Sequence, residues 1–224
     1  MVNSPDNSNS GSGDGTVRER LLDAAEELFC EHSFEGTSIR DIAAAANCNI
    51  ASVNYYFGGK ENLYVELWRR HHTQIVGVRI ESINEVMAKT GGKPDLEVLL
   101  KSFAEAFLGP LMDSNKGPRL MKLMAREMID RNLPKDMFGK EVIRPTMTAM
   151  QDALSKACPA LEQSKIPLVV FSLVSQLLHT ILIKAIHQGI DDQELAQFDP
   201  VMVINHVVAF TAAGIRAYAK EQGK

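Results

Sequence analysis

Cysteine is scarce in this sequence, and its distribution argues against a disulfide-stabilised protein and against a zinc protein. The three cysteines, Cys30, Cys48 and Cys158, are an odd number and lack the short spacings of a zinc site. We therefore expect no disulfide framework and no metal ligands, but reduced thiols in a cytoplasmic protein. A redox-sensing role for Cys48, which falls in a predicted turn, is the alternative.

Sequence motifs of catalysis are also missing. The chain has no glycine-rich phosphate loop, no nucleophile elbow and no pair of histidines four residues apart. The adjacent His71 and His72 point to different faces of a helix, so they cannot chelate one ion, and we expect them at the surface. Neither an enzyme nor a cofactor is predicted.

Positive charge is in short supply, which by itself argues against binding to nucleic acid. The chain has 24 Lys and Arg against 28 Asp and Glu, a net charge of −4, whereas DNA affinity comes largely from neutralising phosphates. Residues 17–60 contain seven acids and only four cations, namely Arg18, Arg20, Arg40 and Lys60. The acids lie mostly on the first predicted helix and can face away from DNA. A DNA-binding prediction must therefore rest on geometry.

Residues 37–60 do have the pattern of a helix-turn-helix. Thr37 or Ser38 can cap a first helix, whose apolar residues recur at helical spacing. Asn47 tolerates the left-handed backbone of a tight turn, and Asn49 can cap the second helix. Two short helices around such a turn are typical of proteins that insert the second helix into the major groove.

The second helix begins with small side chains, which permit close approach to base edges. Ser52 and Tyr55 are expected to face the groove, while Val53 and Phe57 pin the helix to its own domain. Lys60 follows two glycines at the next helix start and is expected to contact phosphate. The predicted DNA-binding residues are Thr37, Ser38, Arg40, Asn49, Ala51, Ser52, Tyr55, Tyr56 and Lys60.

From about Thr16 to Leu67 the chain resembles the N-terminal domain of TetR-type transcriptional regulators. The most specific part is the run Tyr55-Tyr56-Phe57-Gly58-Gly59-Lys60-Glu61-Asn62-Leu63. Asn47, in place of the common turn glycine, and Ile50, in place of a polar or basic residue, depart from the pattern. The rest of the chain is similar in helix lengths and apolarity, with a faint likeness to the CecR-like branch. The resemblance implies an effector that shifts a bridging helix and changes the separation of two recognition helices.

Helical patterns extend to the end of the chain, so the predicted fold class is all-α. We expect a flexible leader at 1–15, a three-helix helix-turn-helix domain at 16–62 with its motif at about 38–57, and a larger C-terminal helical domain at 63–224. The helix that starts at Lys60 has no breaker before Gly91 and would bridge both domains. The C-terminal domain is assigned to effector binding and dimerisation.

Residues 166–183 contain no charge and reach the lower limit of a membrane-spanning length. Ser172, Ser175, Gln176 and His179 recur at helical spacing, and this polar stripe favours a buried helix of a protein interior. A last helix follows Asp199-Pro200. Because these two apolar helices need a partner, we predict a homodimer.

Methionine and phenylalanine cluster in the middle of the chain, and methionine adapts to varied apolar ligands. The candidate effector-binding residues are Phe103, Phe107, Met121, Met124, Met128, Phe138, Met150 and His179. The alternative is plain hydrophobic core, with His179 as a hydrogen-bonded interior histidine. Arg126 and Glu127 either orient a polar end of the ligand or form a solvated pair.

The predicted function is a ligand-responsive transcriptional regulator. It is expected to be a repressor that is released from a palindromic double-stranded DNA operator by a small apolar effector. Two alternatives stay open: an effector-independent DNA-binding protein, and a helical ligand-binding or enzymatic module that does not bind DNA.

Overall fold

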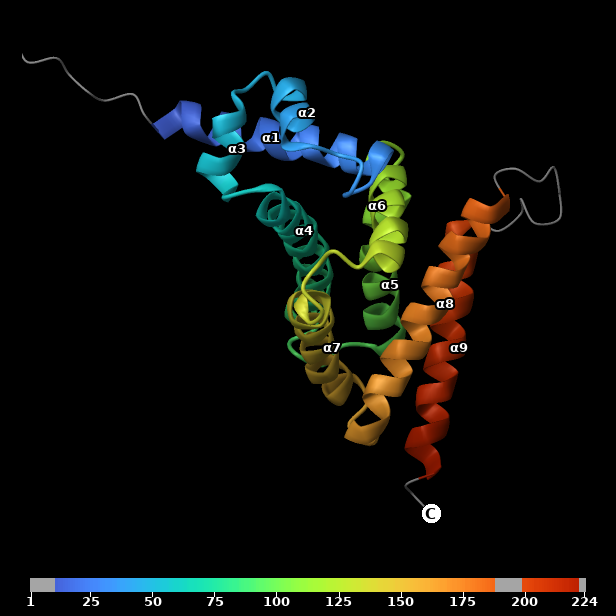
Figure 1. The fold of residues 1–224 in the computed structure, drawn as a ribbon. Helices are drawn as coiled ribbons and strands as arrows, with labels where there is room; N and C mark the ends of the chain where they lie inside the picture. Colours follow the sequence, from blue (N-terminus) through green and yellow to red (C-terminus); the bar gives the residue numbers. More distant parts are fainter. Residues whose placement is uncertain (1–10, 188–198, 222–224) are drawn as a thin grey trace, which may run out of the picture. The chain divides into compact units, whose positions relative to one another are not determined.

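The structure of the protein is a computed structural model that describes residues 11–187 and 199–221. These residues form helices joined by turns and loops, which confirms the all-α prediction (Figure 1). They divide into two compact units. Unit 1 comprises Met1–His71 and Arg119–Lys135, and unit 2 comprises His72–Pro118 and Asp136–Lys224.

Unit 1 contains the predicted three-helix domain together with parts of two later helices. Its core is made of side chains that recur at helical spacing and are almost fully buried, such as Leu21, Phe29, Ile42, Val53 and Leu63. Its elements are α1 (Gly11–His32), α2 (Ile39–Ala45), α3 (Ile50–Phe57), the first turns of α4 (Lys60–Lys89) and most of α6 (Gly117–Asp130).

Unit 2 is a larger helical assembly in which α5 lies against both α8 and α9 (Figure 1). Leu99, Leu100 and Phe103 of α5 are fully buried, as are Leu173 of α8 and Ile215 of α9. Besides the rest of α4, its elements are α5 (Leu96–Met112), a π turn (Gly139–Ile143), α7 (Arg144–Ala157), a 3-10 turn (Gln163–Lys165), α8 (Ile166–His187) and α9 (Pro200–Glu221).

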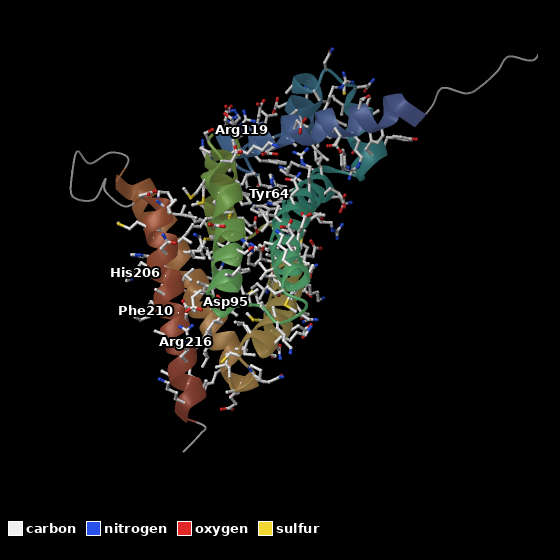
Figure 2. All side chains as sticks on the ribbon, turned by 180° about the vertical axis from the view of Figure 1, so that it is seen from behind. Tyr64, Asp95, Arg119, His206, Phe210 and Arg216 are labelled. Carbon is white, nitrogen blue, oxygen red and sulfur yellow. The ribbon has the colours of Figure 1, made fainter. Side chains whose placement is uncertain are left out.

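Local capping explains where the helices of unit 2 begin. The Asp95 carboxylate accepts from the backbone N–H of Val98 at 3.1 Å, and the Asp199 carboxylate accepts from that of Val201 at 3.2 Å. Arg216 of α9 pairs with Glu97 in the first turn of α5, and Figure 2 shows Arg216 and Asp95 on these two helices. The predicted start of the last helix at Asp199-Pro200 is confirmed.

The predicted boundaries differ from the structure at three places. Helix α1 begins at Gly11, because no proline interrupts 11–15, so only 1–10 of the predicted leader lie outside the described residues. Helix α5 continues through Gly109-Pro110 for one more turn. The compact units divide at 71/72 rather than 62/63, and α6 joins the first unit.

Two helical windows, 163–181 and 200–220, are long and apolar enough to cross a membrane by length and composition. Core helices of soluble proteins pass the same test. One third of each window is buried, so the helix predicted at 166–183 is only partly buried in the single chain. Ser172, Ser175 and His179, which were expected inside, are exposed.

Candidate nucleic-acid interface

The first helix of the motif, α2, begins at a reciprocal cap. The backbone N–H of Asp41 donates to the Ser38 hydroxyl at 3.2 Å, and the N–H of Ser38 donates to the Asp41 carboxylate at 3.2 Å. Hydrogen bonds from the Ser38 hydroxyl and N–H lower the pKa of Asp41. Both residues are exposed, whereas Thr37 is buried.

The turn has the geometry expected from its asparagines. Asn47 lies in the left-handed region at φ 53°, and the N–H of Cys48 donates to the carbonyl of Ala43 at 2.8 Å. The side-chain oxygen of Asn49 then accepts from the N–H of Ala51 at 3.0 Å, which caps α3. Two short helices therefore meet at a fixed turn, as the sequence predicted.

Helix α3 has one buried face and one exposed face. Val53 and Phe57 are buried in unit 1, as expected, while Tyr55 is 76% exposed. The Tyr55 ring packs edge-on against that of Tyr56 at a centroid distance of 4.9 Å, which supports it on the outer face. Ala51 is exposed and Ser52 is half-buried. After the exposed Ile50, this face has small side chains in its first turn and carries an aromatic hydroxyl further on.

Two of the predicted DNA contacts are engaged inside unit 1 instead. The Lys60 ammonium donates to the carbonyls of Phe34 at 2.9 Å and Thr37 at 3.1 Å, and it lies 4.2 Å from the Phe34 ring centroid. The Thr37 hydroxyl lies 2.7 Å from the carbonyl of Ser33. In this structure both side chains hold the loop between α1 and α2, because its carbonyls have no helical partners, and neither is presented for a contact with DNA.

Of the cations counted in the sequence, Arg20 and Arg40 are exposed. Arg18 is taken up by an ion pair with Glu66 at 2.8 Å, and it also lies over the Phe57 ring. The Arg20 guanidinium lies 3.6 Å from the sulfur of Cys48, at the turn of the motif. Few cations are thus left for phosphate contacts on this part of the chain.

The acids of α1 are largely compensated within unit 1. The Arg70 guanidinium lies 2.6 Å from the carboxylate of Glu26, 2.7 Å from that of Asp23 and 3.3 Å from that of Glu19. Burial favours protonation of Glu26, yet the neighbouring His71 and Arg70 hold its pKa below the usual value. These acids therefore oppose DNA less than their number suggests.

Helix α6 contacts α1 and α4 within unit 1 through polar side chains, which the sequence did not predict. The Tyr64 hydroxyl donates to the Glu127 carboxylate at 2.9 Å, and burial raises the pKa of Tyr64. Arg119 pairs with Glu27 at 3.0 Å, and Figure 2 shows Arg119 on α6 and Tyr64 on α4. Arg126 donates to the Glu31 carbonyl. Arg126 and Glu127 therefore neither pair with each other nor point to a ligand.

The predicted effector residues are divided between the two compact units. Met121 and Met124 are half-buried and Met128 is 77% exposed, and all three belong to unit 1. Phe103, Phe107 and Met150 are buried in unit 2, where Phe103 and Phe107 lie 6.1 Å apart by ring centroids. Phe138 and His179 are exposed, so His179 is not an interior histidine.

The two adjacent histidines also differ from expectation. His71 of unit 1 lies 3.4 Å from the Glu26 carboxylate, and the buried His72 of unit 2 lies 3.2 Å from that of Glu141. The prediction of different faces is confirmed, but that of surface positions is wrong. No group of three or more His, Cys, Asp or Glu able to hold a metal occurs in the described part of the chain.

Sequence reasoning missed Arg79, a charged residue on the buried face of α4. It follows Ile75 by four residues and precedes Ile83 by four, and both isoleucines are buried. Helical periodicity was therefore the signal that could have found it.

The capped helices, the fixed turn and the exposed face of α3 define a DNA-binding regulator of the helix-turn-helix class, with a separate helical unit. Comparison with known families agrees. Residues 21–67 match the family of bacterial regulatory proteins called the tetR family, and residues 96–215 match the C-terminal domain of the HTH-type transcriptional dual regulator CecR. The chain belongs to the TetR family, with a C-terminal domain of the CecR type.

Individual relatives are more distant. The probable HTH-type transcriptional regulator YttP of Bacillus subtilis is 38% identical over 23% of this chain and 25% of its own length. The dual regulator CecR of Shigella flexneri is 26% identical over 58% of this chain and 59% of its own. The chain thus spans less than two thirds of either relative. A solved structure titled SmeT-Triclosan complex has a TM-score of 0.62 and 20% identity, covering 86% of this chain and 90% of that one. These relatives are transcriptional regulators rather than enzymes, as expected for this chain.

Proposed function

We propose that this chain is a cytoplasmic repressor that binds a palindromic operator as a homodimer and is released by a small, largely apolar effector. The observation that carries the DNA-binding part is the outer face of α3. It has the small residues Ala51 and Ser52 in its first turn and the exposed Tyr55 one turn later. A recognition helix enters the major groove with its N-terminal residues next to base edges, and this face suits that approach.

The DNA contacts are assigned to exposed or half-buried residues of the motif. Ala51, Ser52 and Tyr55 lie on the outer face of α3 and are proposed to contact bases. Polar side chains near the ends of the two helices are proposed to contact the DNA backbone and so position the motif on the duplex. These are Ser38, Arg40, Asn49 and Tyr56. Because few cations are available, the proposed salt dependence of binding is shallow.

A homodimer is supported by the outer faces of α8 and α9. Phe171 is 69% exposed and Phe210 is 64% exposed, and Figure 2 shows Phe210 and His206 on the outer side of α9. Large apolar side chains at helical spacing on two adjacent helices form a patch that a second copy would cover. The exposed apolar residues of this patch are Leu168, Phe171, Leu178, Val201, Met202, Phe210 and Tyr218.

Effector control rests on a helix that belongs to both units. Helix α4 runs from Lys60 to Lys89 without interruption, and the division into units falls within it. An effector that prefers one position of this helix changes the separation of the two recognition helices in the dimer. A coupling free energy of about 1–3 kcal/mol would change operator affinity by roughly 5- to 150-fold. The triclosan complex of the solved neighbour supports a small apolar effector.

A footprint on the DNA upstream of the protein's own gene tests the proposal. We expect two protected half-sites separated by about one helical turn, or a multiple of it, and loss of protection when an effector is added. Tyr55→Ala should remove the protection without unfolding the protein. Absence of any specific protection would refute the proposal. Protection that no compound reverses would instead indicate an effector-independent DNA-binding protein. Ligand binding without DNA binding would indicate a helical module that does not act on DNA.

A further inference from the structure

The least expected residue in unit 2 is a charged one. Arg79 is only 8% exposed, and it occupies the face of α4 that also carries the buried residues Ile75 and Ile83. An arginine is almost never buried to this extent unless a carboxylate or phosphate compensates its charge. The position therefore asks for a negatively charged partner.

Within the described residues no such partner is found. Arg79 forms no ion pair there, and its Nε–H donates to no acceptor. The guanidinium instead lies over the ring of Phe107, 4.0 Å from its centroid. Burial lowers the pKa of Arg79 to about 10, which reflects the cost of holding the charge away from water.

The contact with Phe107 uses none of the N–H donors of the guanidinium, of which the buried Nε–H has no acceptor among the described residues. A phenyl ring attracts the flat face of the guanidinium, but the five N–H donors point outward in its plane. A carboxylate can accept two parallel hydrogen bonds from this edge, and arginine is favoured over lysine where such planar recognition is needed. Arg79 is thus a buried cation that lies against an aromatic ring and has a donor available for an added acid group.

We propose that Arg79 is the anion-binding residue of the effector site in unit 2, and that the effector is an amphipathic organic anion with a carboxylate or similar planar acid group. The acid group pairs with the edge of the Arg79 guanidinium. The apolar body of the ligand lies against the side chains around it, of which Phe107, Phe103, Ile75 and Ile83 are buried in this unit. This inference rests on the proposed effector binding and narrows the effector from any apolar compound to an acidic one.

Matched pairs of probes test the charge requirement. Benzoate, 1-naphthoate and decanoate are each compared with the corresponding alcohol by calorimetric titration and thermal shift on the full chain. The variant is Arg79→Met, which keeps the length and apolar stem of the side chain. The matched control is Arg216→Met, which removes one cation from an exposed ion pair in the same unit. Both variants change the net charge equally.

We expect at least one of the three carboxylates to bind the wild type and the Arg216→Met control at least 10-fold more tightly than its alcohol does. Arg79→Met should abolish this preference, and Phe107→Leu should weaken it, because the guanidinium loses its support. Equal binding of acids and alcohols, absence of binding by all three acids, or a preference that survives in Arg79→Met would overturn the proposal.

The footprint is scored separately from these titrations. Carboxylate binding at Arg79 without protection of any DNA would refute the proposed repressor function and leave the anion site standing. Protection that is reversed only by neutral compounds would refute the anion site and leave the proposed repressor function standing.

Discussion

Replacing the buried arginine should stabilise the protein in the absence of ligand. Arg79→Met removes a charge that is 8% exposed and has no ion-pair partner among the described residues, while methionine fills most of the same space. Burial lowers the pKa of Arg79 from its usual value to about 10. At about 1.4 kcal/mol per unit this corresponds to a cost of about 3 kcal/mol for the charged form.

Part of that cost is offset in the wild type. The stacking of the guanidinium on Phe107 contributes about 0.5–2 kcal/mol, which the variant loses. The expected net gain is therefore about 1–2 kcal/mol in the free energy of unfolding. For a chain of 224 residues this raises Tm by about 2–8 °C.

Urea titration followed by circular dichroism, together with thermal melts, measures this gain. Because the folded pKa of Arg79 is about 10, the group stays charged at pH 6–9 and the gain should be constant there. Above about pH 9 the folded wild type begins to release the proton while the unfolded chain still holds it. The stability of the wild type therefore rises with pH on account of this group, and the difference between the proteins shrinks.

The Arg216→Met control should lose stability slightly, by about 0–1 kcal/mol, because an exposed ion pair contributes little. A loss of 1 kcal/mol or more in Arg79→Met would refute the reasoning. Such a loss would mean that the guanidinium has a favourable partner in the folded protein. The buried charge would then be no argument for an anionic ligand.

Three further predictions concern the remaining surfaces. Phe171→Asp should dissociate the dimer in light scattering, while Val98→Asp, at another exposed position of unit 2 on α5, leaves it intact; a dimer unaffected by Phe171→Asp would move the interface elsewhere. Tyr55→Ala should weaken operator binding by about 1–3 kcal/mol and leave Tm unchanged, because the ring is exposed. A lowered Tm, with discrimination between DNA sequences retained, would instead assign Tyr55 to packing. Lys60→Ala should lower the free energy of unfolding by about 1–3 kcal/mol, because two hydrogen bonds to loop carbonyls are lost. A variant of unchanged stability that binds all DNA sequences more weakly would show instead that Lys60 contacts phosphate.

The sequence by itself determined the helical fold class and the helix-turn-helix. These depend on interactions between residues close in the chain. Ser38 caps the residue three positions on, Asn47 sets the turn, and Asn49 caps the helix that follows it. Such hydrogen bonds follow from residue type and spacing alone. The buried and exposed faces of α3 were likewise predicted from helical periodicity.

Tertiary structure decided how charged and polar side chains are used. Lys60 reaches carbonyls 23 and 26 positions earlier, and Tyr64 reaches Glu127, so neither contact can be derived from local spacing. The methionines of α6 resemble those of a core in sequence, yet they fall in a different compact unit from Phe103 and Phe107. Periodicity could place Arg79 on a buried face, but only packing shows that no acid among the described residues meets it there. The electrostatic environment of a side chain is set by segments distant in sequence, and therefore the fold had to be known before this charge could be interpreted.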